Sequence, residues 1–262
     1  MMREPIIHVA IQAARAAGNI IARAAHRLDK VSVAEKNPND FVTDIDQRAE
    51  QEIIAIIQKS YPSHSILAEE SGITSGDDYQ WIIDPLDGTR NFIHGFPHFA
   101  VSIAVMYRDK IEYGVIYDPM RQELFTAKRG RGAQLNERRI RVSAKRQLNE
   151  CLLGTGFAGR HQHPENNEES TAILQHMLPI CGDVRRVGAA ALDLAYVAAG
   201  RLDGFWEFGL KKWDIAAGML LVKEAGGMIT DGEGGEHYWE SGDIVAANPV
   251  IMKQLLRAIN RK

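Results

Sequence analysis

The first sixty residues carry the spacing of two amphipathic helices. In residues 5–28, apolar side chains recur every three or four positions and so share one helical face. These positions are Ile7, Ala10, Ile11, Ala14, Ala17, Ile21 and Ala24. A second helix is predicted over about 45–59, with Ile45, Ala49, Ile53, Ile56 and Ile57 facing inward. Thr43 and Asp46 at its start are typical of a capping box, and the polar residues 35–40 predict a loop.

The middle of the chain changes from helical spacing to alternation. Between residues 99 and 142, apolar residues such as Val101, Ile103 and Val105 alternate with smaller ones, and short polar turns separate the runs. This pattern predicts an antiparallel meander. Upstream, residues 65–68 and 81–83 are short apolar runs that predict buried strands.

After Cys151, segments with strand and helix patterns alternate. Helices are predicted at 166–178, 188–199, 214–225 and 249–260, the last with Asn248 as its cap and Pro249 in its first turn. The chain therefore has an α+β front half and an α/β back half. We expect residues 1–147 and 148–262 to form these halves within one compact unit.

Composition narrows the class of protein only a little. The chain has 262 residues, of which 45% are hydrophobic and 25% charged, as in ordinary soluble globular proteins. A net charge of −3 does not give the chain the overall positive charge that is typical of nucleic-acid-binding proteins. Two cysteines fit a reducing cytosol, and we find neither a secretory signal nor an apolar run long enough for a membrane span. We therefore expect a cytoplasmic protein with no membrane partner.

The chemistry is concentrated in residues 84–89, Asp84-Pro85-Leu86-Asp87-Gly88-Thr89. Pro85 favours an extended conformation for Asp84, and Gly88 allows a turn into a new helix. Two carboxylates can then enter one space at a strand end. Oxygen ligands at a rigid turn suit Mg²⁺, and a helix N-terminus suits a phosphate. The alternative is an ordinary turn, since Asp-Pro and Asp-Gly are common turn dipeptides.

Two further acidic positions favour a metal site over a turn. Glu69 and Glu70 follow the predicted strand 65–68, and Asp214 precedes the predicted helix that begins near Ile215. Each has a structural alternative, as solvated loop charges or as a helix N-cap. Three acidic positions, each at the end of an apolar segment, nevertheless predict convergence on one cleft.

Several ordered motifs together resemble the inositol monophosphatase family of lithium-sensitive, Mg²⁺-dependent sugar phosphatases. They are Glu69-Glu70-Ser71, the run 81–89, and Trp213-Asp214 followed by Glu224-Ala225-Gly226-Gly227. The resemblance extends from Asp40 to Asn248, and the stretches 99–105, 117–121 and 190–200 are most similar to bacterial members. It implies a layered αβαβα sandwich with the metal site between the halves. The implied activity is that of an inositol-1(or 4)-monophosphatase, which hydrolyses inositol monophosphate and related sugar or polyol phosphates with metal-activated water.

The resemblance also implies residue roles. Glu69, Asp84 and the carbonyl of Leu86 would hold a first Mg²⁺ ion, and Asp84, Asp87 and Asp214 a second. A third, weaker ion is implied near Glu69. The implied catalytic residues are Asp46, Thr89 and Glu69, with Thr89 and Asp46 orienting the attacking water. For Asp46, a role in the capping box alone is the alternative.

Substrate contacts are implied on both sides of the phosphate. The phosphate should lie against the N–H groups of Gly88 and Thr89. The implied substrate-binding set is Leu86, Asp87, Gly88, Thr89, Arg185, Gly188, Ala189, Ala190, Glu207 and Asp214. Animal members carry threonine where this chain has Ala189, so one hydroxyl contact is absent and strict inositol selectivity is not expected. Lys36 matches a lysine on a loop that covers the metals, with a solvated lysine as the alternative.

A basic cluster between residues 128 and 146 supports a second hypothesis. It comprises Lys128, Arg129, Arg131, Arg138, Arg139, Arg141, Lys145 and Arg146, and we call it the basic hairpin face. It is either a solvated hairpin surface or a docking surface for RNA or an acidic partner. Bacterial members of the family are associated with transcription antitermination at ribosomal RNA operons. A binding role in that machinery is therefore the alternative function, with or without phosphatase activity, and the family resemblance also implies a homodimer.

Overall fold

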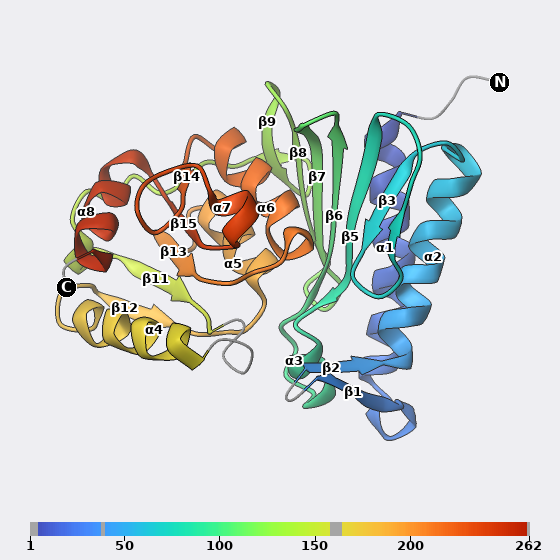
Figure 1. Ribbon diagram of the computed structural model, residues 1–262, viewed down its shortest axis with the longest axis horizontal. Coiled ribbons are helices and arrows are strands. Elements are labelled where there is room, and N and C mark those ends of the chain that lie inside the picture. The colour runs from blue at the N-terminus through green and yellow to red at the C-terminus, as the bar shows by residue number, and fades with distance from the viewer. Residues whose placement is uncertain (1–4, 38–39, 158–163, 261–262) are drawn as a thin grey trace.

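The computed structural model describes residues 5–37, 40–157 and 164–260 of the chain. Helices and sheets alternate in layers across the molecule (Figure 1). The helices are α1 (Ile6–Ala25), α2 (Asp44–Ser60), α3 (Thr89–Ile93), α4 (Pro164–Met177), α5 (Ala190–Ala198), α6 (Lys212–Glu224), α7 (Tyr238–Ser241) and α8 (Pro249–Ile259). Single 3₁₀ turns lie at Leu28–Lys30 and Leu148–Glu150.

The outer helical layer consists of α1 and α2, as the periodicity predicted. The buried face of α1 is built largely from alanine, with Ile21 at its far end, so α2 can lie close against it. On α2, Ile45, Ile53 and Ile57 are buried, whereas Ile56 is only partly covered. The side chain of Thr43 accepts the N–H groups of Ile45 and Asp46, which confirms the predicted capping box.

The predicted loop at residues 35–40 is wrong at 35–37 and at 40, and residues 38–39 lie outside the described part of the chain. Strands β1 (Val33–Asn37) and β2 (Asp40–Thr43) form an antiparallel hairpin there. The residues of β1 between 33 and 35 are exposed, so they lack the apolar alternation that identifies a half-buried strand. Lys36 lies on β1, and its side chain lies outside the described part of the structure.

The larger sheet has eight strands in the order β10-β9-β8-β7-β6-β5-β3-β4. Their bounds are β3 (Ser65–Ala68), β4 (Gly72–Thr74), β5 (Tyr79–Asp87), β6 (Ala100–Tyr107), β7 (Lys110–Asp118), β8 (Glu123–Lys128), β9 (Gly132–Leu135) and β10 (Arg138–Arg139). Strands β5 to β10 pair antiparallel in chain order, which confirms the meander. Strand β3 instead pairs parallel with β5, so both strands end at the same edge.

The smaller sheet has five strands in the order β12-β11-β13-β15-β14. They are β11 (Leu152–Thr155), β12 (Asp183–Arg185), β13 (Gly204–Glu207), β14 (Met228–Thr230) and β15 (Ile244–Ala247). The four long helices predicted for this half are present. Asn248 caps α8 and Pro249 opens it, as predicted. Helix α6 begins at Lys212, so Asp214 lies inside its first turn and is not the N-cap.

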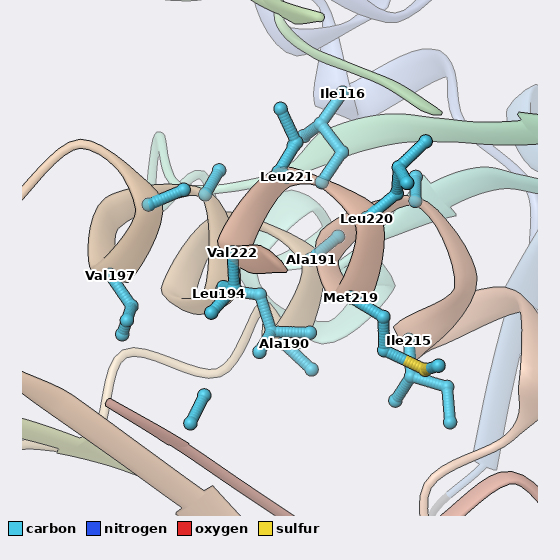
Figure 2. Packing of buried hydrophobic residues seen from close by; sticks show 14 of the residues in the cluster. Ile116, Ala190, Ala191, Leu194, Val197, Ile215, Met219, Leu220, Leu221 and Val222 are labelled. Carbon is cyan, nitrogen blue, oxygen red and sulfur yellow. The ribbon is translucent and has the colours of Figure 1, made fainter. Parts of the chain in front are cut away.

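Three buried clusters fill the four interfaces between the five layers, because the middle one covers both faces of the α5–α6 layer. These layers confirm the αβαβα sandwich. Alternate residues of a strand face different clusters: Phe205 packs with α5 and α6, and Trp206 packs with α8. Figure 2 shows the middle cluster, where Leu194 of α5 and Val222 of α6 lie side by side. The described helices include none with the length and apolar character of a membrane span. The division into halves at residue 147 stays a prediction.

Candidate metal centre

Two acidic segments meet because β3 and β5 are parallel neighbours. Ala68, the last residue of β3, pairs with Ile83, and the N–H of Glu69 donates to the Ile83 carbonyl at 3.2 Å. Glu69 therefore lies beside the end of β5, where Asp84 and Asp87 are placed.

An irregularity in β5 shapes this strand end. Asp84 pairs with Ser102 of β6, but Asp87 pairs with Ala100, so three steps on β5 oppose two on β6. The extra residue in a bulge re-aims side chains, and a bulge is where an interior strand tolerates proline. Pro85 and the bulge together place both carboxylates near each other at the end of β5, and their role as metal ligands stays a prediction.

Asp214 reaches this site from the other half of the chain. The Ser102 hydroxyl donates to the Trp213 carbonyl at 3.3 Å, which anchors the start of α6 on β6 beside Asp84. The Asp214 carboxylate accepts the Lys211 N–H at 2.7 Å, and this bond holds its side chain in the first helical turn.

Burial and neighbouring carboxylates raise the pKa values of Asp84 and Asp87. Burial is the largest cause of the strongly raised pKa of Asp84, followed by the negative charges of Glu69, Asp87 and Asp214. Burial and then Asp214 raise the pKa of Asp87 in the same way. The pKa of Asp214 rises to about 6, chiefly through desolvation, although its side chain retains some exposure.

The donor set fits Mg²⁺. Asp84, Asp87 and Asp214 form no ion pair with a lysine or arginine among the described residues, so their charges call for protons or cations. Carboxylate and carbonyl oxygens are the ligands that this hard cation prefers. Within the described ranges, no three acidic, histidine or cysteine side chains already form a coordination cluster, so a bound ion would draw the carboxylates together.

Asp46 is both a cap and a partner of the candidate site. Its Oδ2 accepts the backbone N–H of Thr43 at 2.8 Å, which closes the capping box. Its Oδ1 accepts the Thr89 hydroxyl at 2.9 Å, across 43 residues of sequence. The carboxylate therefore closes the capping box and also contacts Thr89, and its role in orienting a water stays a prediction. Burial raises the pKa of Asp46, and these hydrogen bonds oppose the rise.

Gly88 forms the turn between the acidic strand and α3. Its φ of 92° is left-handed, and a Cβ there would lie 3.0 Å from the His98 carbonyl and 3.3 Å from the Ala189 methyl. A side chain would therefore be both strained and crowded. The first amides of α3 have no acceptor within the helix, which leaves them available for an anion.

The start of α5 and the end of β13 form the opposite wall. Asp87 Oδ2 accepts the Ala191 N–H at 2.8 Å, which binds the predicted Gly188-Ala189-Ala190 segment to the acidic strand. Glu207 is 8% exposed, so it is not a solvated strand charge. A Cβ on Gly156 would overlap its carboxylate, at 2.0–2.1 Å, so any side chain there would force the Glu207 carboxylate to move.

The position of Arg185 favours a contact with substrate less than the position of Glu207 does. It lies on β12, the edge strand of the smaller sheet, and its guanidinium pairs with Asp183 at 2.5 Å. Both side chains are about half exposed. Its role in substrate binding stays a prediction.

Asp193 is a residue that the sequence analysis did not single out. It is 1% exposed, and neither carboxylate oxygen has a hydrogen-bond partner among the described residues. Burial, followed by the charges of Glu207 and Asp87, raises its pKa strongly. The sequence feature that could have identified Asp193 is that it is the single acidic residue within the apolar helix Ala190–Ala198.

A family model described as the inositol monophosphatase family matches residues 2–262. The chain belongs to the inositol monophosphatase family. This family member is 52% identical over 260 residues to the Nus factor SuhB of Pseudomonas aeruginosa, covering 98% of this chain and 96% of that protein. It is also 52% identical over 254 residues to the Nus factor SuhB of Escherichia coli K12, covering 96% and 94%.

Solved structures agree with this membership. The extragenic suppressor protein suhB of Bartonella henselae superimposes with a TM-score of 0.94 at 45% identity, covering 98% of both chains. The inositol monophosphatase of Anabaena gives a TM-score of 0.85 at 40% identity, covering 97% of this chain and 94% of that one. The family resemblance and the fold predicted from the sequence are thereby confirmed.

Proposed function

We propose that the protein is a Mg²⁺-dependent phosphatase that hydrolyses phosphate monoesters of inositol and of related sugars or polyols, as an inositol-1(or 4)-monophosphatase. The observation that carries this proposal is the convergence of Glu69, Asp84 and Asp87, from the ends of neighbouring strands of one sheet, with Asp214 from helix α6, where the pKa values of the three aspartates are raised. Membership of the inositol monophosphatase family supports it.

The acidic residues would divide between two cations. Glu69, Asp84 and the Leu86 carbonyl would hold one, and Asp84, Asp87 and Asp214 the other, with a third, weaker site near Glu69. Bound Mg²⁺ supplies a water of lowered pKa and neutralises charge on the phosphate and leaving oxygen. Buried carboxylates such as those of Asp84 and Asp87 are the ligands that such ions need.

Thr89 and Asp46 position the attacking water. The Thr89 hydroxyl lies 2.9 Å from Asp46 Oδ1 and 3.0 Å from the Leu86 carbonyl, and its single hydrogen serves one of them. A cation held by the Leu86 carbonyl would take that acceptor, and the hydroxyl would then donate to Asp46. Its oxygen then accepts a hydrogen from the water, and the proton can pass toward Asp46.

The substrate lies between two walls in this proposal. Its phosphate meets the amides of Gly88 and Thr89, and its hydroxyls meet Glu207 and the start of α5. The buried Ala189 offers a methyl group and no hydroxyl, and the pairing of Arg185 with Asp183 withdraws a donor. We therefore propose relaxed selectivity among polyol phosphates.

Phosphate release from a panel of phosphate monoesters tests this function directly. We expect Mg²⁺-dependent hydrolysis of inositol monophosphates and of several sugar phosphates, with inhibition by Li⁺. If none of the phosphate monoesters in the panel is hydrolysed in a Mg²⁺-dependent reaction, the proposal is wrong.

The Thr89→Ala protein should turn over substrate roughly 10²-fold more slowly. A loss of this size is typical when one group that accepts or donates a proton in the reaction is removed. KM should change little, because the hydroxyl serves the water and not the substrate. The matched control is Thr89→Ser, which keeps the hydroxyl and should retain most activity. Equal losses in both proteins would assign Thr89 to packing. Steady-state kinetics at saturating Mg²⁺ measure both constants.

We further propose that the basic hairpin face docks onto transcription machinery. The name Nus factor carried by the SuhB relatives favours this second role. All eight basic side chains of the face are exposed. The Glu224 carboxylate accepts the N–H groups of Gly130 and Gly132, each at 2.7 Å, so α6 holds the hairpin turn in place. A homodimer stays a prediction.

Charge reversal at Arg138 and Arg139 should weaken this docking and leave phosphatase activity intact. These residues form the edge strand β10, remote in sequence from every proposed ligand. Binding to an antitermination complex assembled on RNA should fall at least tenfold, because like charges repel across an interface. Reversal of the exposed Arg23 and Arg27 on and after α1 is the matched control. Equal binding by both double variants would leave the basic hairpin face as a solvated surface.

A further inference from the structure

A second hollow lies toward the end of α6 that is remote from Asp214. Its volume is about 450 Å³, and its lining includes residues of β6, β7, α6 and α7. Helix α6 rises 1.5 Å per residue, so the nine steps from Asp214 to Lys223 span roughly 13 Å. The hollow is therefore separate from the candidate metal centre.

The floor of this hollow is apolar. Ile111, Met219 and Leu220 line it and are themselves almost fully buried, and Met106 adds a half-buried side chain. A volume of this size falls within the range of small-molecule sites. The floor would favour a ligand with a hydrocarbon segment.

The two cations on the wall are already engaged. Lys223 Nζ lies 2.8 Å from the Tyr238 hydroxyl and 5.1 Å from the centre of that ring. Arg129 Nε donates to the Ile111 carbonyl at 2.8 Å and lies 3.2 Å from a carboxylate oxygen of Glu112. The charge of Arg129 is therefore balanced by Glu112, whereas Lys223 keeps one positive charge because its partner Tyr238 is neutral.

The three acids on the wall are not engaged. Asp109, Glu236 and Glu240 are exposed and line the hollow, and none forms an ion pair with another described residue. They come from the β6–β7 turn, the segment before α7, and α7 itself. The net charge of the side chains that line the hollow is therefore negative, and the negative charge is spread around its rim.

We propose that this hollow binds a linear aliphatic polyamine. Its ammonium groups pair with Asp109, Glu236 and Glu240, and its methylene segments cover the apolar floor. The wall already accommodates ammonium groups, since Lys212 Nζ lies 5.1 Å from the centre of the Trp239 ring and Lys223 packs on Tyr238. A compact inorganic cation would leave the floor uncovered, and an organic anion would meet three unpaired carboxylates.

Calorimetric titration of the full chain with spermidine tests the proposal. Saturating Mg²⁺ and low ionic strength keep the acidic metal centre occupied and the rim charges unscreened. We expect one saturable site. Glu236→Gln combined with Glu240→Gln should weaken binding roughly tenfold, the scale of two exposed ion pairs. Phosphatase activity without polyamine should stay unchanged, because neither residue belongs to the catalytic set.

Two controls separate a built site from general charge attraction. Glu52→Gln combined with Glu168→Gln removes two exposed carboxylates from α2 and α4 and should leave spermidine affinity unchanged. Hexaamminecobalt(III), a trication without methylene groups, should bind several-fold more weakly than spermidine. The proposal is overturned if spermidine does not saturate one site, if both double variants bind alike, if the cobalt complex binds equally well, or if citrate binds in its place.

Discussion

The Asp87→Asn protein should fold normally and turn over substrate roughly 10²-fold or more slowly, the scale of losing one electrostatic stabiliser of the transition state. Asp87 is buried, and its Oδ2 accepts the Ala191 N–H at 2.8 Å. Asparagine can keep that hydrogen bond through its amide oxygen, and it suits a turn. It lacks the charge that a hard cation needs, so the Mg²⁺ requirement should rise.

Turnover measured over a range of Mg²⁺ concentrations checks this result. Asp44→Asn is the matched control, since Asp44 also accepts a backbone N–H, from Ser32 at 2.9 Å, but lies outside the acidic cluster. That protein should stay within a few-fold of the unmodified enzyme. If Asp87→Asn does the same at low Mg²⁺, Asp87 serves only to anchor α5 and shape the turn.

Removal of Mg²⁺ should abolish activity and lower thermal stability. Asp84 and Asp87 then lie buried beside the other acidic side chains of the site, and the negative charges repel one another. Ligands that bind only the folded protein stabilise it by mass action, so added Mg²⁺ should raise the melting temperature. Full activity in excess chelator would contradict the two-metal proposal.

The stabilisation by Mg²⁺ should grow as the pH rises. The pKa of Asp214 in the folded protein is about 6, above its ordinary value of 3.8. Between these values the metal-free folded state binds more protons than the unfolded state, so its stability falls with rising pH. Asp84 and Asp87 shift in the same direction. Melting curves with chelator and with Mg²⁺, at pH 5 and pH 7.5, should differ more at the higher pH; equal differences would remove this linkage.

Local pattern alone predicted most elements of the fold. Apolar spacing identified α1, α2 and the long helices of the second half, and alternation identified the meander. These predictions succeeded because each element buries one face, and a buried face leaves a period in the sequence. The exposed hairpin β1–β2 buries no such face at residues 33–35, so no period marked it.

The sequence also identified the acidic residues, through a turn motif and a family resemblance. The sequence could not determine which of these residues lie next to one another in the fold. The parallel pairing of β3 with β5 brings Glu69 to Asp84, and Ser102 anchors the helix that carries Asp214. These arrangements follow from sheet order, which links residues far apart in the chain and leaves no periodic trace.

The tertiary structure alone decided which polar side chains are buried and which already have hydrogen-bond or ion-pair partners. Asp46 divides its two oxygens between a cap and Thr89. Arg185 pairs with Asp183 on an exposed edge, whereas Asp193 is buried without a hydrogen-bond partner among the described residues. The sequence determined the types of chemical group and the local faces that carry them. Burial and partners depend on what packs against each side chain from other elements, and only the assembled layers supply that.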